Sequence, residues 1–198
     1  MNLPNRITLL RIFMIPLMLV FLLVDLDSVT WWSYPLTWGN YTLPMNHLIG
    51  AFLFILAAST DGIDGYLARK NNMVTNLGKL LDPLADKLLV SAVLISLVAL
   101  GKCDAWIAVV IISREFAVTG LREVALLEGS VIAASKWGKA KTITQIIAIS
   151  ALLLNNFPFA WVNFRFDIVS IWLAAIITIY SGVDYFIKNK NIINISKI

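Results

Sequence analysis

Four aspartates stand inside two apolar stretches of the chain, and this placement limits what the chain can fold into. Asp61 and Asp64 belong to the first stretch, and Asp82 and Asp86 belong to the second. Both stretches are otherwise apolar enough to lie in a membrane, where ionisable side chains are costly and usually functional. Carboxylates that converge cannot all stay ionised unless cations hold them. The pattern therefore predicts a membrane domain whose acidic site binds a counter-charge.

Helical periodicity brings the four carboxylates together. Residues 46–69 and 77–101 are predicted to form an antiparallel pair of helices joined by the polar turn KNNMVTN. Asp61 and Asp86 are about equally far from the middle of this turn, as are Asp64 and Asp82. Spacings of three and four residues also place small residues on the same helix faces as the carboxylates; these residues are Gly65, Ala68 and Gly78.

The ligands of such a site are all oxygen atoms. Carboxylate oxygens favour hard cations such as Mg²⁺ or Mn²⁺ over zinc or copper. Two such ions can bridge one phosphate group and support an in-line displacement at phosphorus. Arg69 lies one turn nearer the aqueous end and suits phosphate recognition. The residues predict a metal-dependent phosphate chemistry.

The composition agrees with a membrane location. Of the 198 residues 59% are apolar and only 14% are charged, with a mean hydropathy of +0.81, which is outside the range of soluble domains. We expect an all-α integral membrane protein formed by a single domain, residues 1–198. Six transmembrane helices are predicted, after a short amphipathic N-terminal entry, at residues 6–25, 46–69, 77–101, 105–129, 142–156 and 168–187. Residues 26–45 are predicted to be an aromatic loop at the outer membrane surface.

The distribution of Lys and Arg predicts the orientation. Of the 16 basic residues, this model places 14 on the inner side and only Lys102 and Arg165 outside. Both termini are therefore predicted to be cytoplasmic, in the cell (inner) membrane, with the active site in the cytoplasmic half of the bundle. No nucleic-acid partner is expected.

The first predicted span presents a polar face. Asn5, Thr8 and Arg11 recur at three-residue spacing and share one side of a helix. One interpretation is an interfacial cap with a cytoplasmic anchor. The other is a face that belongs to the site.

A second basic group lies farther along the chain. Arg114 and Arg122 are eight residues apart, so they share a side of the fourth span. An arginine at membrane depth needs an anionic partner, and a bound phosphate would supply one. Lys136 and Lys139 follow near the same membrane face. Lys141 is predicted to follow the positive-inside rule and to contact anionic lipid. Glu115 and Glu123 are predicted to pair with the cations and to have a structural role.

Three other residues are predicted to have structural roles only. His47 is predicted to have a packing or interfacial role. Asp184 is predicted to form a local salt bridge with Lys188, four residues on. Pro83 is expected to kink the third span beside Asp82.

The acidic stretch also carries a family resemblance. It matches D-x2-D-G-x2-A-R-x8-G-x3-D-x3-D, and so resembles the CDP-alcohol phosphatidyltransferases, at all eight fixed positions: Asp61, Asp64, Gly65, Ala68, Arg69, Gly78, Asp82 and Asp86. The resemblance implies that Asp61, Asp64 and Asp82 ligate two divalent metal ions and that Asp86 shares this shell and acts as general base. It also implies a CDP pocket lined by Asp61, Gly65, Ala68, Arg69 and Gly78. A homodimer is implied as well.

Three further segments resemble the bacterial phosphatidylglycerophosphate synthases within this family. They are MNLPNRITLLR, SREFAVTGLRE and SKWGKAKT. The first implies that Asn5 and Thr8 lie beside the nucleotide. The other two imply sn-glycerol 3-phosphate as the acceptor of a phosphatidyl group from CDP-diacylglycerol, with CMP as leaving group. They place Arg114, Arg122, Lys136 and Lys139 around the acceptor phosphate.

Two alternatives stay open at this stage. The acceptor could be serine, inositol or phosphatidylglycerol, although serine and free inositol would leave the basic cluster without a phosphate to bind. A cation transporter could use the four aspartates as an ion path, but it would require two related halves, and no internal repeat is visible in the sequence.

Overall fold

The computed structural model describes residues 3–24, 29, 31–32, 34–38, 41–70, 76–127, 129–130, 132, 135–162 and 164–190. Within residues 3–4, 38, 61–70, 76–77, 79–80 and 136 it describes the backbone only. The predicted turn KNNMVTN has residues 71–75 outside the described part.

The described residues form six α-helices, a two-stranded sheet and one short 3-10 helix. The helices are α1 (Leu3–Leu23), α2 (Met45–Lys70), α3 (Asn76–Ala99), α4 (Ala105–Leu127), α5 (Lys136–Leu153) and α6 (Phe166–Lys188). The strands are β1 (Pro35–Trp38) and β2 (Tyr41–Pro44), and the 3-10 helix η1 covers Phe159–Val162. The prediction of six helices is therefore confirmed, while their crossing of a membrane as six spans stays a prediction.

A β-hairpin replaces part of the predicted outer loop. β1 and β2 pair antiparallel, with Trp38 opposite Tyr41 and Pro35 opposite Pro44. The Tyr41 hydroxyl donates a hydrogen bond of 2.6 Å to the carbonyl oxygen of Leu154, which ties the hairpin to the end of α5. Aromatic and Thr residues favour extended backbone, and pairing satisfies backbone groups that a loose loop would leave to solvent.

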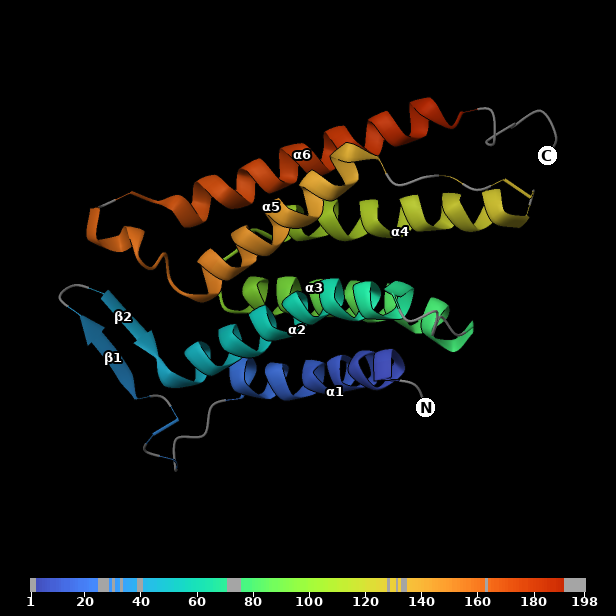
Figure 1. Ribbon diagram of the computed structural model, residues 1–198. Coiled ribbons are helices and arrows are strands. Elements are labelled where there is room, and N and C mark those ends of the chain that lie inside the picture. The colour runs from blue at the N-terminus through green and yellow to red at the C-terminus, as the bar shows by residue number, and fades with distance from the viewer. Residues whose placement is uncertain are drawn as a thin grey trace.

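The helices lie in two layers (Figure 1). α1 packs against α2 and α3 in one layer, α6 packs against α4 and α5 in the other, and the contacts of α3 with α4 and of α2 with α5 join them. Phe54, Leu94, Leu97, Ile107 and Ile149 are among the largest fully buried apolar side chains, and they belong to one core cluster. α1 begins and α6 ends at the end of the bundle opposite the hairpin.

The outer surface of the bundle suits a lipid environment. Phe13, Val109 and Ile176 are each at least 60% exposed, and such apolar exposure is unusual for a soluble monomer. Asn5–Leu23 of α1 and Phe166–Lys188 of α6 are long and apolar enough to cross a membrane. Met45–Thr60, the first part of α2, is a shorter apolar segment. The described part of the chain is thus mostly helical, with two helices that are candidates for membrane spans.

Helix bounds depart from prediction mainly at α5. This helix begins six residues before the predicted residue 142, because the Ser135 side chain caps its first turn by accepting a 3.0 Å hydrogen bond from the Gly138 amide. α3 continues through Pro83 to Ala99.

Candidate active site

Two residues of α1 hold the two aspartates of α3. The Thr8 hydroxyl donates a hydrogen bond of 2.5 Å to Asp82 Oδ1. Arg11 Nη1 donates to Asp86 Oδ1 at the same distance. Thr8 and Arg11 are three residues apart on α1, and their partners are four residues apart on α3. Both spacings keep two side chains on one side of a helix, so both contacts form where α1 faces α3.

The burial of these groups separates the two interpretations of the α1 face. Asn5, Thr8 and Arg11 are 6%, 1% and 1% exposed, so they are not an interfacial cap. The Arg11 side chain is 0% exposed and that of Asp86 is 41% exposed. Arg11 therefore anchors a carboxylate that a ligand can still reach from the other side.

The rest of the acidic motif is placed only by backbone. α2 is helical through residues 61–70 and packs against both α1 and α3. The side chains of Asp61, Asp64, Gly65, Ala68 and Arg69 lie outside the described ones, so their roles stay predictions. Gly78 is buried at the start of α3. Asp82 and Asp86 present only oxygen donors one helical turn apart, roughly 6 Å, and this donor set fits a hard divalent cation.

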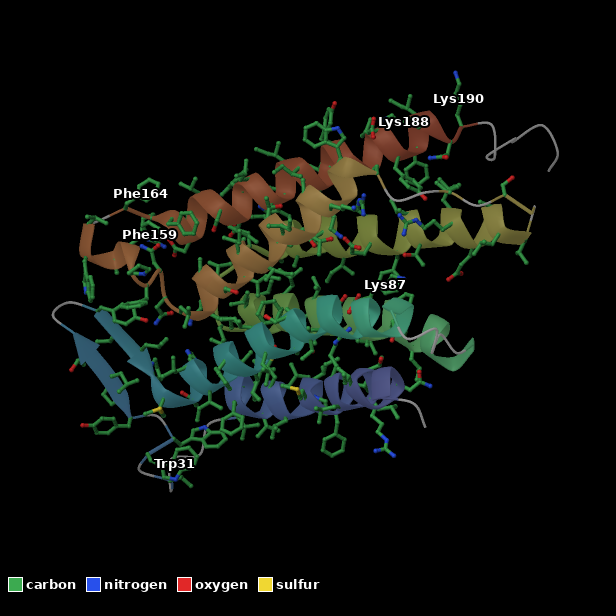
Figure 2. The ribbon with its side chains drawn as sticks, in the orientation of Figure 1. Trp31, Lys87, Phe159, Phe164, Lys188 and Lys190 are labelled. Atoms are coloured by element: carbon green, nitrogen blue, oxygen red, sulfur yellow. The ribbon has the colours of Figure 1, made fainter. Side chains whose placement is uncertain are left out.

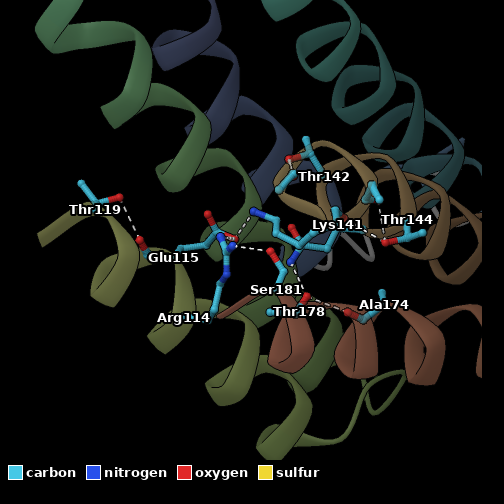
Figure 3. A network of polar contacts seen from close by, with 12 residues as sticks. Arg114, Glu115, Thr119, Lys141, Thr142, Thr144, Ala174, Thr178 and Ser181 are labelled. Atoms are coloured by element: carbon cyan, nitrogen blue, oxygen red, sulfur yellow. Dashed lines mark hydrogen bonds and ion pairs between the residues drawn. The ribbon is translucent and has the colours of Figure 1, made fainter. Parts of the chain in front are cut away.

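Two arginines of α4 bind to α6. Arg114 Nη2 donates a 2.6 Å hydrogen bond to Ser181 Oγ (Figure 3), and Arg122 Nε donates a 2.9 Å hydrogen bond to the Tyr185 hydroxyl. The prediction that both share one side of the helix is confirmed. A Cβ at Gly182 would lie 3.1 Å from Arg114 Cγ, so glycine permits this close approach. The buried Arg114 Nε has no hydrogen-bond partner in the described part of the chain.

The interpretation of Lys141 was wrong. Its side chain is 7% exposed and forms an ion pair with Glu115 of α4 (Figure 3). The prediction that Glu115 pairs with a cation is thereby confirmed. The positive-inside rule counts charges near a membrane face, but it cannot tell which way a side chain points from its helix. Lys141 points into the bundle rather than towards lipid.

Sequence reasoning missed Lys87. This residue follows Asp86 on α3 and is partly buried, and Figure 2 shows it on the side of α3 that faces α4. Its ammonium lies within electrostatic range of Glu123, Glu115 and Asp86. Among the described residues it has no hydrogen bond or ion pair. A lysine inside the apolar run LLDPLADKLLV was the signal that could have revealed it.

Lys87 links the acidic residues of α3 to the basic residues of α4 and α5. Arg114, Arg122 and Lys141 lie within electrostatic range of one another, and Lys87 lies within range of both Arg122 and Asp86. These four cations therefore neighbour one another in series, with two carboxylates in their range, Glu115 and Glu123, and Lys87 is the cation in range of Asp86. This surplus of positive charge favours an anionic ligand.

The remaining predicted residues have plainer positions. Lys139 is exposed, and Lys136 begins α5 with its side chain outside the described ones. Lys188 Nζ donates to Asp184 Oδ2 at 2.9 Å, so the predicted local salt bridge is confirmed. His47 Nδ1 lies 3.2 Å from Lys102 Nζ.

Comparison with known proteins now identifies the family. The family model for CDP-alcohol phosphatidyltransferase matches residues 1–180. The chain is 55% identical, over 95% of both chains, to the CDP-diacylglycerol--glycerol-3-phosphate 3-phosphatidyltransferase of Bacillus subtilis (strain 168). It is 37% identical to the protein of that name from Rickettsia bellii (strain RML369-C), over 93% of both chains. The chain belongs to the CDP-alcohol phosphatidyltransferase family.

Proposed function

We propose that this protein transfers a phosphatidyl group from CDP-diacylglycerol to sn-glycerol 3-phosphate, forming phosphatidylglycerophosphate and CMP. The observation that carries the proposal is the group of cations on α3, α4 and α5, which Lys87 connects to Asp86, since a phosphorylated acceptor matches it. The relatives named for this reaction, at 55% and 37% identity, support the same acceptor.

Metal ions belong to this proposal. The family uses divalent metal ions, and Asp61, Asp64, Asp82 and Asp86 would hold two of them, Mg²⁺ or Mn²⁺. When bound, such ions neutralise the pyrophosphate of CDP-diacylglycerol and polarise the phosphorus under attack. Thr8 orients the Asp82 carboxylate for this role through its hydrogen bond.

Asp86 is the proposed general base. Its carboxylate is fixed by Arg11 and is 41% exposed, so an acceptor hydroxyl can reach it. Asp86 takes the proton of that hydroxyl while the hydroxyl oxygen forms a bond to the lipid-linked phosphorus. The bond from this phosphorus to the CMP oxygen breaks, and CMP leaves.

The substrates are proposed to lie on either side of Asp86. Residues of α1, α2 and α3 would line the CDP pocket: Asn5, Thr8, Asp61, Gly65, Ala68, Arg69 and Gly78. Arg114 and Arg122, with Lys136 and Lys139 at the start of α5, would hold the acceptor phosphate. The structure leads us to add Lys87 to this group. Its place between Asp86 and Arg122 would set the acceptor hydroxyl next to its base.

The wider setting is part of the same proposal. Residues 1–198 would act as one domain in the cell inner membrane, with six spans, cytoplasmic termini and the active site in the cytoplasmic half. The protein would work as a homodimer among membrane lipids.

Replacing Arg122 by Lys is expected to raise the KM for glycerol 3-phosphate at least about tenfold, because an ammonium cannot reproduce the forked guanidinium contacts to phosphate. Lys87→Gln should have a similar effect. The KM for CDP-diacylglycerol should stay near that of the unmodified protein in both variants. Steady-state CMP release, with Lys190→Gln as a control at an exposed lysine, measures this. Equal increases in both KM values would contradict a specific acceptor role.

The reaction itself is tested with purified protein in detergent. CMP release is measured with CDP-diacylglycerol, Mg²⁺ or Mn²⁺, and one acceptor at a time: glycerol 3-phosphate, glycerol, serine, inositol or phosphatidylglycerol. We expect release with glycerol 3-phosphate alone, its loss when EDTA removes the metal, and its recovery when metal is restored. Release with another acceptor would contradict the proposal that the basic residues bind the acceptor phosphate, but it would support the proposed role of the aspartates. No release with any acceptor, in folded protein, would reject the proposed reaction.

A further inference from the structure

The hairpin end of the bundle contains a cavity that the proposed reaction does not use. It measures about 600 Å³ and lies between the joint that links α3 to α4, the end of α5 and the start of α6. Pockets of this size hold small molecules and head groups. Ala99, the last residue of α3, is 13 residues beyond Asp86, or roughly 20 Å along a helix axis. The cavity is therefore at the other end of α3 from Asp82 and Asp86.

The walls of the cavity are partly polar and partly apolar. Ile107, Leu152 and Ile171 supply apolar surface, and the joint between α3 and α4 supplies polar groups. Trp172 also lines it, and its ring packs edge to face on Trp106 with the centroids 5.0 Å apart. Tryptophans gather where a membrane meets water. These walls suit an amphiphile whose head group lies at the membrane surface.

One basic residue of the cavity is paired with a carboxylate and the other is not. Arg165 donates to both carboxylate oxygens of Asp167, at 3.1 and 3.0 Å, so these two charges neutralise each other. The partly buried Lys102 contacts the His47 ring at 3.2 Å and has no carboxylate within 4.0 Å in the described part of the chain. Burial lowers the pKa of Lys102 to about 8, as expected for an ammonium without a counter-ion. An anion beside it would relieve this cost.

Asp104 adds a second unmatched group. It is exposed, and its carboxylate has no partner among the described side chains. A simple anion would be repelled by it, whereas a head group that carries both a phosphate and a hydrogen-bond donor would satisfy Lys102 and Asp104 together. Lys102 and Arg165 are also the two basic residues that the orientation count left outside.

We propose that this cavity binds the phosphodiester head group of a membrane phospholipid, with its phosphate against Lys102 and an amine or hydroxyl against Asp104. The lipid chains would follow the apolar wall towards the bilayer. This site is independent of the reaction proposed above.

The test measures phospholipid binding to the full chain in detergent by native mass spectrometry. Phosphatidylglycerol and phosphatidylethanolamine are titrated separately against the unmodified protein, Lys102→Gln and the control Lys190→Gln. Loss of the charge-assisted contact should weaken binding of both lipids about tenfold in Lys102→Gln alone. Equal affinities in all three proteins would overturn the proposal. Gel filtration and the thermal midpoint establish that each protein is folded.

Further arms identify the ligand. Ala160→Phe fills the cavity without changing its charge and should also weaken lipid binding; an unchanged affinity would place the lipid elsewhere. Asp104→Asn should weaken phosphatidylethanolamine more if an amine contacts Asp104, and phosphatidylglycerol more if a hydroxyl does, because only the first head group has an amine and only the second has hydroxyls. No effect on either lipid would remove Asp104 from the site. Displacement of lipid by millimolar inorganic phosphate would overturn the lipid assignment in favour of a free phosphate site.

Discussion

Replacing Asp86 by Asn is expected to lower CMP release at least about a thousandfold, because an amide cannot accept the proton of the acceptor hydroxyl. The fold should persist at a cost in stability, because the amide oxygen can still accept the Arg11 hydrogen bond but the buried guanidinium loses its counter-charge. Gel filtration and the thermal midpoint establish that the variant is folded before its turnover is compared. CDP-diacylglycerol binding, measured by equilibrium titration, should stay within a few fold of the unmodified protein.

Asp184→Asn is the matched control for this variant. Asp184 also pairs with a basic side chain, Lys188, at the 2.8 Å separation of a simple salt bridge, but it lies on α6 away from the motif. Its turnover should equal that of the unmodified protein. If Asp86→Asn kept more than a tenth of the turnover, Asp86 would not be the base, and a neighbouring motif aspartate would become the candidate.

Replacing Glu115 by Gln is expected to cost about 3 kcal/mol or more in the free energy of unfolding, because it leaves the Lys141 ammonium buried without a counter-charge. The two side chains are 17% and 7% exposed, so water cannot take over the role of the carboxylate. The measurement is reversible unfolding in detergent micelles. Lys141→Met should lower the free energy of unfolding by less, because the Glu115 carboxylate still has a counter-charge in Arg114, whose Nη1 lies 3.8 Å from Glu115 Oε1.

The double variant Glu115→Gln with Lys141→Met completes a thermodynamic cycle. Removing both charges of a buried pair is often nearly neutral, so we expect most of the stability to return. Asp184→Asn again serves as control, because Lys188 is 63% exposed and such a surface pair contributes at most about 1 kcal/mol. A Glu115→Gln variant as stable as the control would mean that the pair does not form in the protein.

The local helical pattern was predictable from sequence. Six helices appear near the expected residues, since a helix interior repeats every 3.6 residues and its apolar runs mark its length. The same periodicity correctly placed Arg114 and Arg122 on one side, and it paired Asp184 with Lys188 within one turn. The acidic motif identified the reaction class because its residues lie close together along the chain.

Only the tertiary structure determined the contacts between helices. Thr8 meets Asp82 across 74 residues of sequence and Arg11 meets Asp86 across 75, and no spacing within one helix predicts such partners. Lys141 turns inward to Glu115, and Lys87 lies on the side of α3 that faces α4, for the same reason. A one-dimensional pattern determines which side chains share a helix face. Only the packing of the helices determines what that face meets, and so which charges become part of the site.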